Sequence, residues 1–213
     1  MASHDTARPP LPSPIAAVPD AEPMSEDLLT PDEARALVNA SSSRAPTGTR
    51  NRALVAVMYR SGLRPGEALA LVPADVDLEA GTVRVPPRKG GRRRLTGLDR
   101  GTRELIGIWL VRRAERGIGD DRTLFCTLAG EPLKAAYVRE LLPRLARRAR
   151  ISKRVHPLAL RYANAAELAE EGMPAGMIDR RHPEVPVGGA RRYRRQVSEA
   201  DVAAAVAARP WSL

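Results

Sequence analysis

Four side chains that lie far apart in the sequence could together cleave and rejoin a phosphodiester bond. They are Arg64, Lys89, Arg161 and Tyr193. Two arginines can offer paired N–H donors to the equatorial oxygens of a phosphoryl group under attack. A lysine can give a proton to the leaving oxygen, which arginine effectively cannot, and a tyrosine hydroxyl can attack phosphorus and hold the phosphoryl group covalently. The set predicts phosphoryl transfer through a covalent intermediate, without a metal ion or another cofactor.

Each of these residues also has a simpler explanation. Arg64 could form an ion pair with Glu67 at the start of a helix. Lys89 could belong to a solvated basic turn that touches phosphates without specificity. Tyr193 could pack against a neighbouring helix, although the arginines beside it would favour loss of the phenol proton, whose pKa is ordinarily about 10.

Composition indicates an anionic partner and a single folded domain. The 213 residues carry a formal net charge of +10, which favours nucleic acid over an anionic membrane. A coding bias would explain the preference for Arg over Lys but not the net excess of positive charge. No apolar stretch approaches the ~18 residues that span a bilayer, and prolines near the N-terminus argue against a signal peptide. The single Cys126 is expected to be buried and fits a reducing compartment, so we expect a cytoplasmic, nucleoid-associated protein.

The hydrophobic patterns predict a mainly α-helical domain with a small β-hairpin or three-stranded sheet. Residues 1–27, rich in Pro, Ala and Ser, are expected to form a disordered tail, which leaves 28–213 as the domain. Capping residues, prolines and apolar spacing predict the helices, and alternating apolar residues around Gly81 predict the hairpin. The expected helices are 30–40, 50–61, one from Pro65, 101–116, 135–150, 157–171, 174–181 and 198–208, and the expected third strand is 95–98.

These elements would position the four side chains. Arg64 would precede the helix that starts at Pro65, and Lys89 would lie in a turn of the sheet region. Arg161 would lie within the helix 157–171, and Tyr193 on a helix that follows the loop after residue 182. A short extended piece is expected at 123–127. For the helix 101–116, the predicted core residues are Leu105, Ile108, Trp109 and Val111.

The local contexts of the four residues resemble those of the catalytic domain of the tyrosine recombinase (phage integrase) family, from about Leu28 to the C-terminus. Family members carry, in order, an arginine after Gly-Leu followed by an acidic residue, a lysine in a hairpin turn, a His-x-x-Arg motif, and a tyrosine soon after a Leu-Gly-His motif. The matching segments are Gly62-Leu63-Arg64-Pro65-Gly66-Glu67, Arg88-Lys89-Gly90-Gly91, Leu158-Ala159-Leu160-Arg161-Tyr162 and Arg191-Arg192-Tyr193. The resemblance implies a site-specific recombinase or integrase that cleaves double-stranded DNA through a 3′-phosphotyrosine and acts as a multimer on DNA.

The sequence departs from the family pattern at both histidines. Leu158 stands where His-x-x-Arg has its histidine, and Tyr162 follows the arginine where a histidine is usual. His156 could substitute for the first histidine, although a lone His before a proline is more often a surface or cap residue. Counting back from Tyr193 places Glu184 on the histidine of Leu-Gly-His, and His182, two residues earlier, could replace it.

The resemblance implies further supporting roles. Glu67 would orient Arg64. Tyr162 adjoins Arg161 on the same expected helix, and from this position it is expected to hydrogen-bond to the site. Two basic runs are expected to contact DNA phosphates, through Arg88, Arg92, Arg93, Arg94, Arg191 and Arg192. The N-terminal DNA-clamping domain of the family has no counterpart in the sequence, so a separate clamp or accessory protein is a further expected partner.

Two other functions remain open from the sequence. The first is an integrase relative that binds DNA without cutting it, which the altered histidines favour. The second is an unrelated basic helical protein that binds RNA or DNA. The apolar face of the C-terminal helix from Ser198, with Val202, Val206 and Trp211, could pack onto a neighbouring subunit or fold back onto its own domain.

Overall fold

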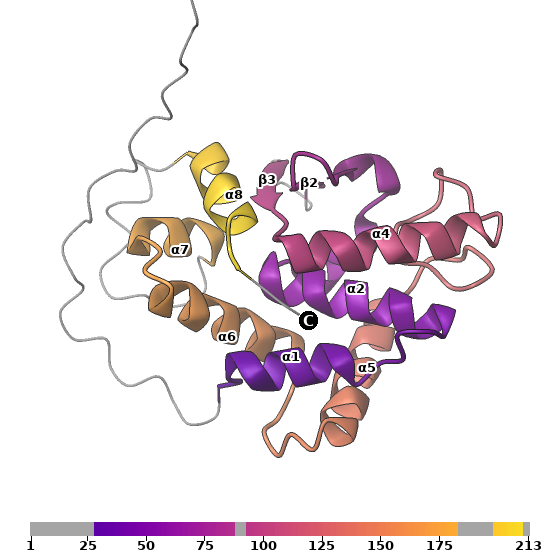
Figure 1. Ribbon diagram of the computed structural model, residues 1–213, viewed down its shortest axis with the longest axis horizontal. Helices are drawn as coiled ribbons and strands as arrows, with labels where there is room; N and C mark the ends of the chain where they lie inside the picture. Colours follow the sequence, from indigo (N-terminus) through magenta and orange to yellow (C-terminus); the bar gives the residue numbers. More distant parts are fainter. Residues whose placement is uncertain (1–27, 88–92, 183–197, 211–213) are drawn as a thin grey trace, which may run out of the picture.

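The computed structural model describes residues 28–87, 93–182 and 198–210. The expected tail at 1–27 lies outside the described residues, and so do seven of the predicted site residues: Arg88, Lys89, Arg92, Glu184, Arg191, Arg192 and Tyr193. The described part confirms the expected mainly helical fold with a small three-stranded sheet (Figure 1). Its helices are α1 Pro31–Asn39, α2 Pro46–Arg60, α3 Pro65–Ala70, α4 Arg100–Ala114, α5 Ala135–Arg148, α6 Pro157–Glu170, α7 Ala175–Arg181 and α8 Glu199–Ala207.

Local sequence signals set where the helices begin. At α1, the Thr30 hydroxyl accepts from the Glu33 backbone N–H at 3.1 Å, and the Glu33 carboxylate accepts from the Thr30 N–H at 2.8 Å, so the expected capping box is confirmed. α2 begins at Pro46, earlier than the expected residue 50. The proline presets a helical φ, and the Ser42 hydroxyl accepts from the backbone N–H of Ala45 at 3.0 Å just before the helix.

α2 is the central helix of the domain. It packs against α4 on one side and against α1 and α6 on the other (Figure 1). Every residue from Ala53 to Arg60 on this helix is buried, including Tyr59 and Arg60. Because this part of α2 has no face in contact with solvent, the charged side chain of Arg60 requires partners inside the protein.

The inward face of α4 differs from the predicted one. Leu105 and Trp109 are buried as expected, whereas Ile108 and Val111 are 48% and 58% exposed, so their assignment to the core is wrong. The buried stripe instead continues through Ile106 and ends in Arg113. The Arg113 guanidinium donates to the carbonyls of residues 119 and 124, at 2.8 and 2.9 Å. A charged residue thus occupies a core position because backbone carbonyls satisfy it.

The sheet is antiparallel with the order β1-β2-β3, where β1 is Val76–Asp77, β2 is Thr82–Val85 and β3 is Arg94–Gly97. A 3-10 turn, η1, precedes it at Pro73–Asp75. The extended piece expected at 123–127 is reduced to an isolated bridge between Cys126 and Pro132, and Cys126 is buried as expected.

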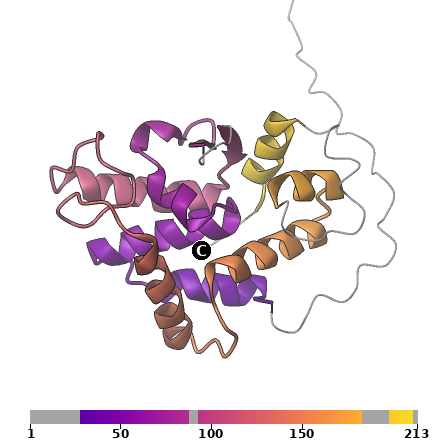
Figure 2. The same ribbon diagram turned by 180° about the vertical axis from the view of Figure 1, so that it is seen from behind.

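α8 folds back onto its own domain and lies against β3, as both views show (Figures 1 and 2). A Cβ built on Gly97 would lie 2.2 Å from the carbonyl oxygen of Ala203, so only glycine allows this approach. Of the two arrangements left open for the C-terminal helix, the structure shows the one within the chain. No helix among the described residues is sufficiently long and apolar to cross a bilayer.

Candidate active site

The turn after α2 positions Arg64. Gly62 has a φ of +60°, which reverses the chain after the helix, and Leu63 anchors the turn with a fully buried side chain. Arg64 then takes the N-cap position of α3, with Pro65 as the first helical residue. The Glu67 carboxylate accepts from the Arg64 backbone N–H at 2.8 Å. The backbone on both sides of Arg64 is therefore fixed while its side chain remains 35% exposed.

α6 supplies the second arginine and binds it to the same turn. Arg161 lies one turn into α6 and is only 3% exposed. Its guanidinium donates to the carbonyl of Gly62 and, at 3.4 Å, to the carbonyl of Arg181. Arg161 thus connects the Gly62 turn with the C-terminal end of α7.

Arg64 and Arg161 line one cavity of about 280 Å³. The rest of its lining comes from the beginnings of two helices: Pro65, Gly66 and Glu67 of α3, and Pro157 and Leu158 of α6. The structure therefore brings together the two arginines that the sequence predicts at the reacting phosphate. Leu158 is 40% exposed in this lining, so an apolar side chain stands where the related motif has a histidine.

Glu67 links Arg64 to the sheet. One oxygen of its buried carboxylate receives the Arg94 guanidinium at 2.7 Å, whereas the Arg64 guanidinium is 4.0 Å from the other oxygen. Arg94 belongs to β3, so this ion pair connects β3 with α3. The sequence grouped Arg94 with the DNA-contacting arginines, but its guanidinium is engaged within the domain; the neighbouring Arg93 is exposed.

His182 lies at the junction of the two arginine segments. It directly follows α7 and is fully buried. A Cβ on Gly62 would lie 2.7 Å from the ring carbon Cε1 of His182. Burial, together with the nearby cations Arg181 and Arg161, holds the pKa of His182 well below its ordinary value. Of the two candidates for the second family histidine, His182 adjoins this site and Glu184 lies outside the described residues.

His156 and Tyr162 occupy other positions. His156 is the N-cap of α6, where its Nδ1 accepts from the Ala159 backbone N–H at 3.2 Å. This is the cap role left open by the sequence. Tyr162 packs against a small apolar cluster formed by Ala165, Leu168 and Ile178, between α6 and α7.

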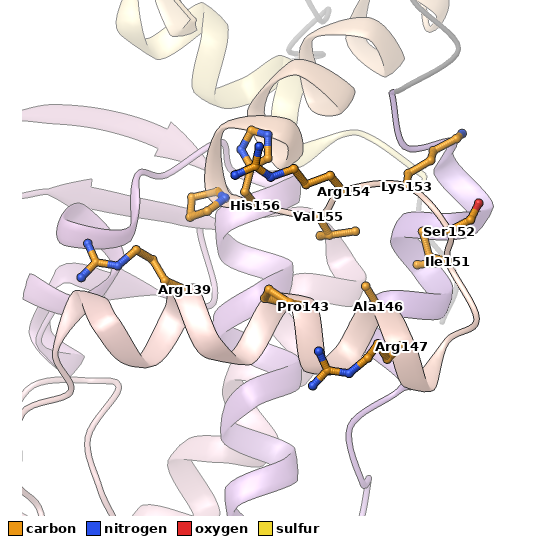
Figure 3. A pocket seen from close by; sticks show the side chains of 11 residues that line it. Arg139, Pro143, Ala146, Arg147, Ile151, Ser152, Lys153, Arg154, Val155 and His156 are labelled. Atoms are coloured by element: carbon orange, nitrogen blue, oxygen red, sulfur yellow. The ribbon is translucent and has the colours of Figure 1, made fainter.

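A second, larger cavity of about 420 Å³ lies between α5 and the segment that leads into α6 (Figure 3). Positively charged side chains dominate its polar lining: Arg139, Arg147, Lys153 and Arg154. The Lys153 amine is bound to the Glu33 carboxylate at 2.7 Å, whereas the three arginines are exposed. Pro157 lines both this cavity and the one with the arginine pair, so the two are neighbours at the start of α6.

A network of buried ion pairs supports the site and was not predicted from the sequence. The Arg60 guanidinium contacts carboxylates of Asp99 at 2.6 Å and Glu167 at 2.7 Å. Arg209, which follows α8, binds the same Glu167 at 2.6 Å and Glu171 at 2.5 Å. The network joins α2, α4, α6 and the C-terminal segment. The available signal was that Arg60 ends the apolar run 53–59 of α2 and that Glu167 lies among the alanines and leucines of α6, where charges need partners.

The predicted lysine and tyrosine fall in two chain segments whose ends are described. Lys89 belongs to the connection between β2 and β3, which pair up to Val85 and Arg94. Tyr193 belongs to the connection between α7 and α8. Glu199 at the start of α8 contacts the Arg180 guanidinium at 3.5 Å and accepts from the Leu95 backbone N–H at 3.2 Å. Within the described residues, no group of three or more His, Cys, Asp or Glu side chains is arranged to hold a metal ion.

Known proteins resemble this chain in sequence and in structure. Tyrosine recombinase XerC of Pelotomaculum thermopropionicum is 30% identical over 162 residues, which cover 73% of this chain and 53% of that protein. Tyrosine recombinase XerD of Ralstonia nicotianae is 35% identical over 156 residues, which cover 70% and 49%. The chain thus spans about half the length of these curated relatives.

Solved structures share the fold. A crystal structure of XerA recombinase matches with a TM-score of 0.64 and 28% identity, covering 71% of this chain and 54% of that one. XerH site-specific recombinase, solved in a complex with its difH substrate, matches with a TM-score of 0.64 and 24% identity over 79% of this chain and 50% of that one. Residues 27–182 match the phage integrase family. The match includes both cavity arginines, and it ends at His182. The chain belongs to the phage integrase family.

Proposed function

We propose that this chain is a site-specific DNA recombinase of the tyrosine type, which cleaves one strand and rejoins it through a 3′-phosphotyrosine intermediate. The observation that carries the proposal is the convergence of Arg64 and Arg161 on one cavity. Two guanidinium groups from separate helices, held by the Gly62 turn, suit the charge that develops on a phosphoryl group under attack.

The remaining roles follow from chemistry and from the family. Tyr193 is the proposed nucleophile. Its attack on phosphorus replaces the phosphodiester bond of the DNA by a phosphotyrosine bond, which a DNA hydroxyl can later attack to rejoin the strand. Lys89 is the proposed proton donor to the leaving 5′-oxygen. Glu67 positions the Arg64 backbone, to which its carboxylate is hydrogen-bonded. His182 is the proposed histidine of the site.

Double-stranded DNA is the proposed partner. The net charge of +10 and the arginine-lined cavity beside the arginine pair (Figure 3) support binding of a phosphate backbone across the start of α6. We further propose that the chain assembles as a multimer on DNA and that a clamp or accessory protein adds contacts to the DNA.

Covalent trapping tests the proposed reaction. A pool of duplexes with a randomised sequence and a nick would be incubated with the protein, and DNA that remains attached in detergent would be recovered and sequenced. We expect trapping by the wild type and none by Tyr193→Phe. Arg64→Ala and Arg161→Ala should lower the yield by about 10²–10³-fold, as loss of one donor to a charged transition state does, with little change in DNA affinity.

The same assay separates the alternative functions. DNA binding that weakens with salt, without covalent product under any condition, would support a relative that binds DNA but does not cut it. Equal loss of binding and trapping in Arg64→Ala and Arg161→Ala would contradict their placement at the reacting phosphate. Arg112→Ala is the matched control, because Arg112 lies on the exposed face of α4 and pairs with Glu115. This variant should trap DNA normally.

A further inference from the structure

A buried chain of polar side chains adjoins Arg161 at the contact between α6 and α7. Asn164, three residues after Arg161 on the same face of α6, is fully buried. Its Oδ1 lies 2.8 Å from Nε2 of His182 and 3.4 Å from Nε of Arg181. The His182 Nδ1 has no hydrogen-bond partner within the described residues. Asn164 therefore contacts the proposed site histidine on one of its two ring nitrogens only.

Arg181 determines which way the Asn164 amide faces. An arginine only donates hydrogen bonds, so the amide atom that faces its Nε must be the carbonyl oxygen. Arg181 itself is held in place, because it donates to the Thr96 hydroxyl at 2.6 Å and to the Arg60 carbonyl at 2.8 Å. The reverse amide orientation would direct an NH₂ group at a guanidinium, and neither side could accept.

The amide orientation in turn determines the tautomer of His182. Since a carbonyl oxygen only accepts, the His182 ring must carry its proton on Nε2, which donates to Asn164. A 180° turn of the ring would place the carbon Cε1 at Asn164 in place of Nε2 and would lose the 2.8 Å contact, so the contact also fixes the orientation of the ring. Nδ1 therefore carries the lone pair.

The charges around His182 keep the ring neutral. Besides burial, the groups that lower its pKa are all arginines: Arg181 of α7, Arg161 of α6, Arg94 of β3 and Arg209 after α8. A second proton on Nδ1 would place another positive charge among them. In the resting protein, Nδ1 is thus a hydrogen-bond acceptor.

We propose that Asn164 is a positioning residue which, oriented by Arg181, fixes His182 in the Nε2-protonated tautomer, so that Nδ1 is the ring nitrogen that carries the lone pair. The inference rests on the proposed function of His182 in strand cleavage. Its structural part, the tautomer, does not depend on activity.

The tautomer is measured directly by NMR. Protein with ¹⁵N-labelled histidine would be examined through long-range correlations between ring protons and ring nitrogens, with His182→Gln used to identify the signal. We expect a single Nε2-protonated form of His182 in the wild type and a mixture, or the other tautomer, in Asn164→Ala. A wild-type ring protonated on Nδ1 would overturn the proposal even if recombination were demonstrated.

A double-mutant cycle tests the functional part. Asn164→Ala should slow covalent trapping by up to the effect of His182→Ala, which for a lost proton-transfer helper is about 10²–10⁴-fold, and should add no further loss in the His182→Ala background. If Asn164→Ala slowed trapping equally in the wild-type and the His182→Ala backgrounds, Asn164 would have a merely structural role, and the proposal would be overturned. If His182→Ala traps DNA normally while Tyr193→Phe does not, the proposed function stands and this inference fails.

Two further variants control for folding. Asn51→Ala removes another buried asparagine, which is bonded to Arg50 at 3.0 Å and to Tyr137 at 2.9 Å, and should leave the rate of trapping by folded protein unchanged. Asn164→Asp still accepts from Nε2 but adds a negative charge that raises the pKa of His182. We therefore expect it to retain trapping, with the low-pH limb of the rate profile moved to higher pH. A profile that coincides with the wild type would contradict the contact.

Discussion

Substituting Gly62 by alanine is expected to damage both stability and the site, for two separable reasons. The residue has a φ of +60°, and a left-handed conformation costs an L-residue roughly 1–2 kcal/mol. Reduced freedom of the unfolded chain offsets about 0.4–1 kcal/mol of this. The second reason is steric, because the new Cβ would lie 2.7 Å from Cε1 of His182 and 3.1 Å from Nε of Arg181.

Neither neighbour of the new methyl group can move away cheaply. His182 is bonded to Asn164, and Arg181 is bonded to Thr96 and to the Arg60 carbonyl. Overfilling a packed interior in this way typically adds about 1–3 kcal/mol. We therefore expect the free energy of unfolding of Gly62→Ala to fall by about 1–4.5 kcal/mol in total.

Gly117→Ala is the matched control. Gly117 has a similar φ of +66°, but a Cβ there would meet nothing within 4 Å. It should lose only the backbone part, so Gly62→Ala should be the less stable variant by about 1–3 kcal/mol in urea unfolding followed by circular dichroism. Equal stability of the two variants, within about 0.5 kcal/mol, would refute the claim that Gly62 is required by the contact with His182.

Three further predictions concern charge. Asp99→Asn removes the carboxylate that lies 2.6 Å from the buried Arg60 guanidinium. We expect the free energy of unfolding in urea to fall by about 3 kcal/mol, which is the lower end of the usual range because other acidic partners of Arg60 remain. Because the pKa of His182 is lowered in the folded state, the unfolded chain binds more protons below about pH 6.5. Stability should then fall as pH drops through that value, by at most about 1.4 kcal/mol per pH unit from this group, and less steeply in His182→Gln. Replacing Arg139 and Arg147 by alanine should weaken DNA binding and reduce the slope of log affinity against log salt by up to about 1.8, since each phosphate contact contributes about 0.9.

Controls accompany these three measurements. Asp99 also caps α4 by accepting from the Thr102 N–H at 2.8 Å. Asparagine caps a helix equally well, so Asp99→Asn isolates the ion pair. A decrease in the free energy of unfolding below about 1 kcal/mol would mean that the pair contributes no more than a weak surface contact. A pH slope unchanged in His182→Gln would assign it to another group. Arg100→Ala removes an exposed arginine of α4, and an equal salt effect there would show that charge alone, without location, governs binding.

Local signals predicted most of the helices. The capping box of Thr30 and the prolines at residues 31, 65 and 157 mark helix starts that the structure confirms. These signals act within a few residues and depend on backbone groups that any helix end leaves unsatisfied. The same locality explains the late predicted start of α2, where the side chain of Ser42 and Pro46 act before the first apolar residue of the helix.

Long-range partners limited the prediction of the core. On α4, apolar character alone assigned Ile108 and Val111 to the interior, whereas the buried face includes Arg113, whose carbonyl partners come from the following loop. Buried arginines such as Arg60 and Arg181 belong to the interior only because particular partners are present in the fold. A prediction from hydrophobic periodicity counts these arginines as polar, and it therefore assigns the wrong residues to the buried face of the helix.

The candidate site was partly accessible from the sequence. The resemblance of their local motifs to those of the family implied that Arg64 and Arg161 meet, and the structure brings both to one cavity. Asn164 was missed, although its position three residues after Arg161 puts it on the same helix face. Counting back from Tyr193 placed Glu184 on the family histidine and left His182 as its possible replacement; His182 packs against Gly62 beside the arginine pair, and Glu184 lies outside the described residues.

The salt bridges of Arg209 have a practical consequence for anyone who shortens this polypeptide. Arg209 lies beyond the last turn of α8, yet it is only 5% exposed and neutralises two acidic side chains of α6. Trimming the sequence at Ala207 would keep every helix of the described residues and still remove the Arg209 guanidinium from Glu167 and Glu171. A shortened version should therefore end after Arg209 and not at the last residue of α8.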